Sequence, residues 1–365
     1  MTGADVKLIA FYLPQYHPIP ENDAWWGKGF TEWTNVAQAR PRFRGHDQPR
    51  IPADLGFYDL RVPESRMAQA ELAREYGIHG FCYYHYWFNG KRLLERPFNE
   101  VLASGRPDFP FCLCWANENW TRRWDGGDSH ILLGQNYGVE DDRAHIRSLL
   151  PALDDRRYIR VGNKPLLLIY RTEIMPDPAR TAEIWREETH KAGIGDIYLA
   201  RVESFNSTTT PREIGFDAAV EFAPDWSDLR TAATRKFQHT LGRLGVKLRL
   251  IERGYLDNMV IDYDALVERM LAKAIPDFPR IRCVTPSYDN SPRRRRQAAI
   301  FVGATPEKYG VWLKRVIAAG KERRSQPECQ IVFINAWNEW GEGNYLEPDL
   351  RWGRQYLEQT KRALR

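Results

Sequence analysis

Eight short apolar runs, spaced along the whole chain, constrain its fold more than any other feature. They cover residues 8–13, 80–84, 111–115, 165–170, 197–202, 218–222, 282–286 and 331–334. Each run is apolar along most of its length instead of alternating with polar residues, as is typical of strands buried on both faces of a sheet. Because successive parallel strands need a crossover between them, the pattern predicts an α/β protein.

Helical patterns fill several of the intervals between these runs. They cover residues 64–76, 142–153, 178–192, 264–274 and 306–319. Glycines follow three of them, and Thr305-Pro306 begins the last, which are typical stop and start signals. The alternation predicts a (β/α)8 TIM barrel, and a doubly wound open sheet is the alternative fold.

Two connections are much longer than the others. Residues 14–63 follow the first predicted strand, and residues 224–262 follow the sixth. Long loops without clear periodicity are usually lids or functional insertions. Because both follow the carboxyl end of a strand, we expect both to overhang the active-site face of the barrel. No repeat or linker divides the chain, so residues 1–365 are expected to form one catalytic domain.

Composition is that of an ordinary globular protein, with 28% charged and 43% apolar residues. The net charge of +5 depends largely on four consecutive arginines, 293–296, and does not indicate a nucleic-acid partner. No apolar run approaches the roughly 18 residues of a membrane span, and no signal-peptide pattern is present, so we expect a cytoplasmic protein unless a leader has been removed. The sequence does not specify the oligomeric state.

Five cysteines lie in or beside apolar runs, which predicts buried free thiols: Cys82, Cys112, Cys114, Cys283 and Cys329.

Polar and aromatic side chains gather directly after the predicted strands, where barrel enzymes hold their active sites. Aromatic faces stack on sugar C–H groups, and carboxylates and amides hydrogen-bond hydroxyls. The pattern therefore predicts a carbohydrate as the partner. The candidate substrate-binding residues are Tyr12, His17, Trp33, Tyr84, His85, Trp87, Trp115, Asn117, Glu118, Trp120, Glu203, Glu221, Tyr288, Asn338 and Trp340.

The candidate catalytic residues are Glu339 and Glu342, which follow the eighth predicted strand. Two carboxylates three positions apart often lie on an exposed helix face, but here tryptophans and glycines surround them. Cleavage of a glycosidic bond usually requires two carboxyl groups. Three rival carboxylates leave the assignment open: Glu118, Glu203 and Glu221.

Other chemistries are weakly supported. His17 and His85 lack the spacing of a metal motif, so we expect neutral histidines that bind hydroxyls, with no metal and no cofactor. No GxSxG, GxGxxG or P-loop motif is present. The arginines at 293–296 belong either to a solvated loop or to a site for an anionic sugar or phosphate.

Five motif regions resemble the WbsX-like family, which is related to the endo-α-1,2-mannosidases and mannanases of glycoside hydrolase family 99. They are residues 11–18, 25–35, 81–88, 114–120 and 335–348. Proteins of this family are often encoded with bacterial surface-polysaccharide genes. The resemblance covers nearly the whole chain and implies a (β/α)8 barrel.

The resemblance also implies a mechanism. The related mannosidases carry a similar E-W-x-E motif, which maps onto Glu339 and Glu342. The first glutamate is the base for the sugar's own 2-hydroxyl, and attack by that oxygen gives a 1,2-anhydro sugar. The second glutamate protonates the leaving oxygen and then activates water. The mannosidases commonly have His at the position of Gly341, which leaves the sugar and linkage open.

Two functions follow from these features. One is a retaining glycoside hydrolase acting on an α-linked bacterial glycan, and the other is a glycosyltransferase of surface-polysaccharide assembly. Transferases that use nucleotide sugars usually need a phosphate cradle or a metal-binding DxD. The DxD of this chain, Asp262-Tyr263-Asp264, lies at a predicted helix start and is interpreted as a cap, which favours the hydrolase.

Overall fold

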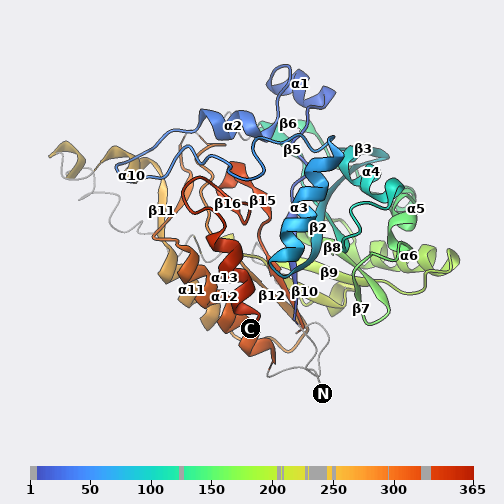
Figure 1. Cartoon of the computed structure of the whole chain (residues 1–365). Helices are drawn as coiled ribbons and strands as arrows, with labels where there is room; N and C mark the ends of the chain where they lie inside the picture. The colour runs from blue at the N-terminus through green and yellow to red at the C-terminus, as the bar shows by residue number, and fades with distance from the viewer. Residues whose placement is uncertain are drawn as a thin grey trace.

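Eight parallel strands form a closed barrel in the computed structural model (Figure 1). Hydrogen bonding runs once around the barrel and closes between β1 and β2, where Ile9 is level with Gly80. The predicted (β/α)8 barrel is therefore confirmed, and the open sheet is excluded by this closure. In order around the barrel, the strands are β1 (Lys7–Tyr12), β2 (Ile78–Phe88), β4 (Phe111–Trp115), β8 (Lys164–Ile169), β9 (Tyr198–Glu203), β10 (Ala218–Glu221), β12 (Arg280–Val284) and β14 (Ile331–Ile334).

The structure describes most of the chain. The described residues are 6–122, 127–203, 207, 209–226, 229, 245–248, 252–294, 296–321 and 330–365. Much of the second long connection and Cys329 lie outside this set. Within it, no helix is both long enough and apolar enough to cross a membrane.

Helices cover the outside of the barrel. Figure 1 shows α11, α12 and α13 on one side of the barrel and α5 and α6 on another. The sequence predicted five of these helices and missed α4 and α13. In the described part of the β9–β10 connection, the helical element is a single 3-10 turn (Arg212–Ile214). The outer helices are α3 (Pro63–Glu75), α4 (Arg96–Ser104), α5 (Val139–Leu153), α6 (Pro178–Lys191), α11 (Tyr263–Ala272), α12 (Pro306–Lys321) and α13 (Gln355–Ala363).

Smaller elements that the sequence did not predict follow the carboxyl ends of the strands, with the exception of β7, which pairs with the start of β8. The first long connection contains two helices of seven residues each, too short to give a clear helical period. Figure 1 shows both helices, with β5 and β6, at the end of the barrel away from the N-terminus. These elements are α1 (Pro20–Trp26), α2 (Glu32–Gln38), β3 (Lys91–Leu93), β5 (Trp120–Arg122), β6 (Gly127–Leu133), β7 (Arg160–Val161), η2 (Thr172–Ile174), α10 (Arg253–Asp257), β11 (Met259–Asp262), β13 (Ala299–Val302), β15 (Asn338–Glu339), η5 (Trp340–Glu342) and β16 (Asn344–Tyr345).

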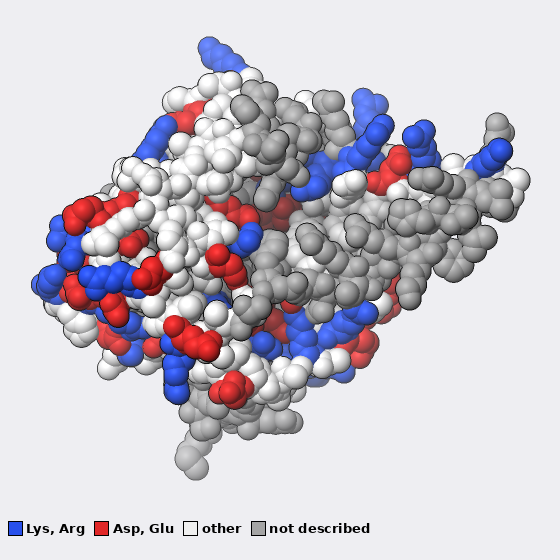
Figure 2. Space-filling view, turned by 180° about the vertical axis from the view of Figure 1, so that it is seen from behind, with Lys and Arg blue, Asp and Glu red and all other residues white. Residues whose placement is uncertain are grey.

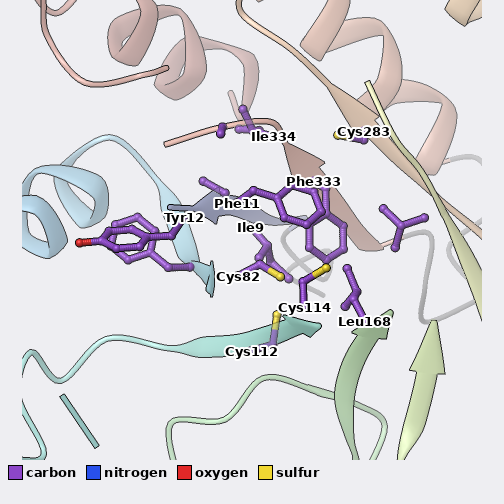
Figure 3. Close-up of a cluster of buried hydrophobic side chains, with 14 of the residues drawn as sticks. Ile9, Phe11, Tyr12, Cys82, Cys112, Cys114, Leu168, Cys283, Phe333 and Ile334 are labelled. Atoms are coloured by element: carbon purple, nitrogen blue, oxygen red, sulfur yellow. The ribbon is translucent and has the colours of Figure 1, made fainter. Parts of the chain in front are cut away.

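The barrel interior is a packed apolar core (Figure 3). Phe11 and Phe333, on neighbouring strands, have ring centroids 5.1 Å apart, and both side chains are fully buried. Burial of one such side chain stabilises the fold by roughly 1.5–3 kcal/mol. The expected free buried thiols are confirmed for the four cysteines that the structure describes: Cys82, Cys112, Cys114 and Cys283.

Charged side chains of both signs are interspersed on the described part of the face shown in Figure 2. Acidic and basic residues lie side by side there. Among the described residues of the molecule as a whole, side chains of opposite sign form ion pairs, such as Arg186 with Asp217 and Lys164 with Asp196. Exposed pairs of this kind contribute little to stability, typically ~0–1 kcal/mol each. Because charges of both signs are interspersed, the described part of this face is not a continuous basic surface.

The close approach between β2 and the segment before β4 generates a prediction about stability. A Cβ atom at Gly80 would lie 2.5 Å from the Pro110 carbonyl oxygen and 2.8 Å from Ile159 Cδ1. We expect Gly80→Ala to lower the free energy of unfolding by about 1–3 kcal/mol in urea titrations, because a strand backbone must shift. Gly134→Ala, where the nearest atom is 3.7 Å away, is the matched control; an equal loss in both variants would contradict the packing argument.

Candidate active site

A cavity of about 820 Å³ opens at the carboxyl ends of the barrel strands. Aromatic, amide and charged side chains share its walls, and they come from the carboxyl-terminal part of β2 and from segments that follow the other strands. The residues that matter for the site are Gln15, Asn22, Trp26, Tyr84, Tyr86, Glu118, Trp120, Tyr170, Phe222, Trp226, Tyr288, Asn290, Arg293, Arg294, Gln297, Glu339 and Glu342.

Glu339 and Glu342 reach this cavity from a small hairpin that follows β14. Glu339 ends β15, and Glu342 ends the 3-10 turn η5. Gly343 then reverses the chain with a φ of +55°, a conformation that glycine adopts readily. The Asn338 side chain holds the hairpin against the end of β1, because it accepts from the Leu13 N–H at 2.7 Å and donates to the Leu13 carbonyl at 3.0 Å.

The guanidinium of Arg293 lies between the two glutamates. Its Nη2 is 2.9 Å from Glu339 Oε2, and its Nη1 is 2.7 Å from Glu342 Oε1. Nη2 also lies 2.8 Å from Oε2 of a third carboxylate, Glu32, which comes from α2. Only 13% of the Arg293 side chain is exposed, so one buried cation pairs with three carboxylates.

The sequence left two interpretations of the arginines at 293–296, a solvated loop or a site for an anionic sugar or phosphate. The solvated loop is wrong for Arg293. Arg293 is the ion-pair partner of the glutamates, whereas Arg294 lines the cavity and Arg296 is exposed. Arg295 lies outside the described residues. No local motif marked Arg293, because its partners are far away in the sequence.

Burial controls the protonation of this cluster. It raises the pKa of Glu339 to about 8, since removal from water penalises the charged carboxylate; Arg293 opposes the shift, and Glu342 and Glu32 add to it. Burial likewise raises the pKa of Glu32, with Arg293 again opposing.

Four other predicted binding residues line the same cavity: Tyr84, Glu118, Trp120 and Tyr288. Glu118 is paired with Arg171, whose Nη1 lies 2.8 Å from Glu118 Oε1. Among the three rival carboxylates, Glu118 is the one at the cavity wall.

Three predicted residues lie behind the hairpin that carries Glu339 and Glu342. Asn338 binds the β1 backbone, and Trp340 donates from Nε1 to Glu347 at 2.6 Å. Trp33 packs on Trp340 with ring centroids 5.6 Å apart and donates to the Tyr58 carbonyl. The structure places these side chains where they support the hairpin, outside the cavity lining.

Six further predicted residues are buried away from the cavity lining. His85 Nε2 is 2.9 Å from His145 Nε2, and His17 Nδ1 is 3.0 Å from the Pro14 carbonyl oxygen. Burial lowers the pKa of His17 to about 4 and that of His85 to about 3, so both are neutral at physiological pH. The others bond to neighbouring protein groups: Tyr12 to Gln69, Trp87 to Asp141, Trp115 to the Trp87 carbonyl and Asn117 to the Arg171 backbone.

Glu203 and Glu221 also lie away from the cavity. Glu203 pairs with Arg201 and Arg280, each at 2.9 Å. Glu221 pairs with Arg282 at 2.5 Å and with Lys273 at 3.7 Å. These carboxylates therefore compensate the charges of three arginines and a lysine. In the described residues, no cluster of His, Cys, Asp and Glu could hold a metal ion.

Several cavity residues escaped the sequence reasoning. Tyr86 carried a usable signal, because it is two positions after Tyr84 and so lies on the same face of β2. Trp26, Tyr170 and Trp226 also follow strands but were not singled out as binding residues. Glu32 gave no signal beyond an acid in the first turn of a short helix.

A family model described as "Glycosyltransferase WbsX" matches residues 8–360. The chain belongs to this family. Two proteins named WxcX, from two strains of Xanthomonas campestris pv. campestris, are 46% identical to it over 357 residues. That alignment covers 98% of this chain and 49% of each relative, so the chain spans about half the length of the curated relatives it matches.

Solved structures show the same fold at low sequence identity. A glycoside hydrolase family 99 endo-α-mannosidase from Bacteroides thetaiotaomicron superposes with a TM-score of 0.57 at 14% identity, covering 98% of this chain and 96% of that one. A "glycoside hydrolase-like protein" superposes with a TM-score of 0.56 at 14% identity, over 100% of this chain and 95% of the other. This WbsX-family chain thus shares its barrel fold with glycoside hydrolases.

The burial of Glu339 generates a prediction about stability and pH. A carboxyl group with a folded pKa near 8 and an unfolded pKa near 4.5 stabilises the fold below about pH 4.5 and loses that contribution as the pH rises through 8. In Glu339→Gln this loss is absent, so its unfolding free energy should fall less than that of the wild type between pH 5 and pH 9. Denaturant titrations at several pH values measure the difference.

Glu140→Gln, which changes a carboxylate that is 92% exposed, is the matched control. It should reproduce the wild-type dependence on pH. A Glu339→Gln curve parallel to the wild type throughout this range would contradict the raised pKa.

Proposed function

We propose that this chain is a retaining glycoside hydrolase that acts on an α-linked bacterial glycan. The observation that carries the proposal is the placement of Glu339 and Glu342 on adjacent nitrogens of one guanidinium, at the wall of a large aromatic cavity. Two carboxyl groups at one site are the usual machinery of glycoside cleavage. The barrel shared with glycoside hydrolases is consistent with this reading.

The proposed reaction uses the sugar's own 2-hydroxyl as the nucleophile. Ionised Glu339 removes the proton from this hydroxyl, and the oxygen attacks C1 to form a 1,2-anhydro sugar. The bond from C1 to the leaving oxygen breaks while Glu342 protonates that oxygen. Glu342 then takes a proton from water as the water attacks C1, and Glu339 returns its proton to the 2-oxygen. Two inversions at C1 give net retention.

The cavity walls suit a carbohydrate. Indole rings of Trp26, Trp120 and Trp226 lie around it, and such rings stack on the C–H faces of sugars. The amide side chain of Asn22, whose Oδ1 and Nδ2 have no hydrogen-bond partner among the described residues, is available for hydroxyl groups. A volume of about 820 Å³ is within the range of small-molecule sites, which are roughly 300–1,000 Å³.

A glycosyltransferase of surface-polysaccharide assembly is the second candidate, and the description of the matching family favours it. The one DxD sequence of the chain argues against this candidate. Asp262 accepts from the Ala265 N–H as the cap of α11, as expected from the sequence, and neither Asp262 nor Asp264 lines the cavity.

Substitution of each glutamate tests the proposal. Glu339→Gln and Glu342→Gln keep the side-chain shape but remove proton transfer, so each should lower kcat/KM by about 10²–10⁴-fold. The assay is release of reducing ends from a panel of bacterial polysaccharides and aryl α-glycosides, with thermal melting to check the fold. Wild-type turnover in both variants would disprove the assignment.

The same panel separates the two candidates. A hydrolase releases sugar without any nucleotide sugar, and proton NMR of the first product should show the α-anomer. Turnover that requires a nucleotide sugar, or tight binding of a nucleoside diphosphate in calorimetry, would instead favour the transferase.

A further inference from the structure

The backbone of Gly341 lies in direct contact with the Glu32–Arg293 ion pair. A Cβ atom at position 341 would be 1.9 Å from Glu32 Oε2, 3.0 Å from Glu32 Cδ and 2.8 Å from Arg293 Nε. Real Cβ atoms do not approach other heavy atoms this closely. The backbone at 341 is not in the left-handed region, so the absence of a side chain here is a matter of space.

Glu32 is held in place from several sides. It is in the first turn of α2, where Thr31 provides a capping box with Thr34. Its N–H donates to the Gln15 carbonyl at 3.2 Å, and Asn35 Nδ2 donates to its Oε1 at 3.2 Å. The Glu32 side chain is fully buried.

Glu32 in turn restrains Arg293. Arg293 Nε donates to Glu32 Oε2 at 2.8 Å, and Nη2 lies at the same distance from that oxygen. A guanidinium is planar and its donors are fixed relative to one another. Once Nε is held by Glu32, the directions of Nη1 and Nη2 are set, and these are the nitrogens that bind Glu342 and Glu339.

We propose that Glu32 and Arg293 form a positioning unit that holds Glu339 and Glu342 in their working geometry, and that Gly341 leaves the space this unit occupies. The proposal rests on the proposed function, because it concerns the same two glutamates. It adds two residues that act through the catalytic pair, together with the backbone position that makes room for them.

The unit also sets the electrostatics of the pair, and its two members act in opposite directions. Arg293 favours the ionised form of Glu339, whereas the charge of Glu32 disfavours it. The phenols that face the cluster are Tyr16, Tyr84, Tyr86 and Tyr288, and burial raises the pKa of each above its usual value. They stay neutral over the working range and do not contribute to the acid limb.

Because Arg293 and Glu32 act in opposite directions on the ionisation of Glu339, substituting each one should shift the pH profile in opposite directions. A purely structural role would not produce such shifts. In the proposed reaction Glu339 must be ionised, so the acid limb of kcat/KM reports its pKa in the free enzyme, near 8 in the wild type. Glu32→Gln removes a neighbouring negative charge and should move the acid limb to lower pH. Arg293→Met removes the positive charge and should move it to higher pH, each by about 1 unit or more.

The measurement uses the full chain and the member of the aryl α-glycoside or polysaccharide panel that the wild type cleaves. Arg293→Met should also lower kcat/KM by at least about 10-fold, because the glutamates lose their common restraint. Arg296→Met, at an exposed arginine, is the matched control and should keep the wild-type profile. If Arg293→Met does not melt cooperatively, Glu32→Gln carries the test of the acid limb. Arg293→Lys, which keeps the charge but loses the planar set of donors, then tests the restraint alone and should lower kcat/KM.

Gly341→Ala tests the argument about space. The new methyl group should displace Glu32 and lower kcat/KM by about 10-fold or more, whereas Gly134→Ala should not. Because Gly341→Ala and Glu32→Gln disturb the same contact, the double variant should lose much less than the product of the two single losses. Strictly multiplicative losses would show that residue 341 acts independently of Glu32.

Failure of this proposal can be told apart from failure of the proposed function. Suppose that Glu339→Gln and Glu342→Gln are inactive but the acid limb does not move in Glu32→Gln or in Arg293→Met. This result would overturn the positioning unit alone. Full activity in both glutamate variants would overturn the proposed function itself. An acid limb that moves in the same direction in Glu32→Gln and Arg293→Met would also contradict the unit.

Discussion

The structure of the site depends on one buried guanidinium that binds three carboxylates. Arg293 is the positive charge that pairs with Glu32, Glu339 and Glu342. A buried carboxylate without a partner is costly, because desolvation penalises its charged form. Bringing three of them together is tolerable when a fixed cation binds all three. Burial and the neighbouring carboxylates raise the pKa of Glu339, so that protonation of this residue relieves the remaining negative charge as the pH falls.

A second layer of contacts holds the segment that carries the pair. Asn338 ties the hairpin to the end of β1, and Trp340 donates to Glu347 at its base. Glu347 also accepts from Tyr58 and Gln69, and burial raises its pKa to about 7. Both ends of the motif are therefore bound to the barrel rather than to solvent, which is the rigidity that a pre-organised site requires.

The comparisons establish the family and the fold, whereas the chemistry is argued from the residues of the site. Membership of the WbsX family and the barrel fold follow from the match over residues 8–360 and from the closed ring of strands. The chemistry rests on the residues of this chain, since solved structures at 14% identity share only a fold with it. The acid pair in an aromatic cavity favours hydrolysis of a glycan, and the helix-capping role of Asp262 weakens the nucleotide-sugar reading.

The barrel, five of its helices and the strand end at which Glu339 and Glu342 lie could be predicted from the amino-acid sequence. Strands and helices have a local period of apolar residues, so these features can be read from neighbours in the chain. The grouping of the carboxylates emerged only in the folded protein, where some share a cavity and others, such as Glu203 and Glu221, compensate arginines elsewhere. The Arg293 contacts with Glu32 and Glu339 join segments 261 and 46 positions apart, and no local pattern records such a pairing. The same holds for Gly341, since the atoms that exclude a side chain there belong to α2 and to the segment after β12.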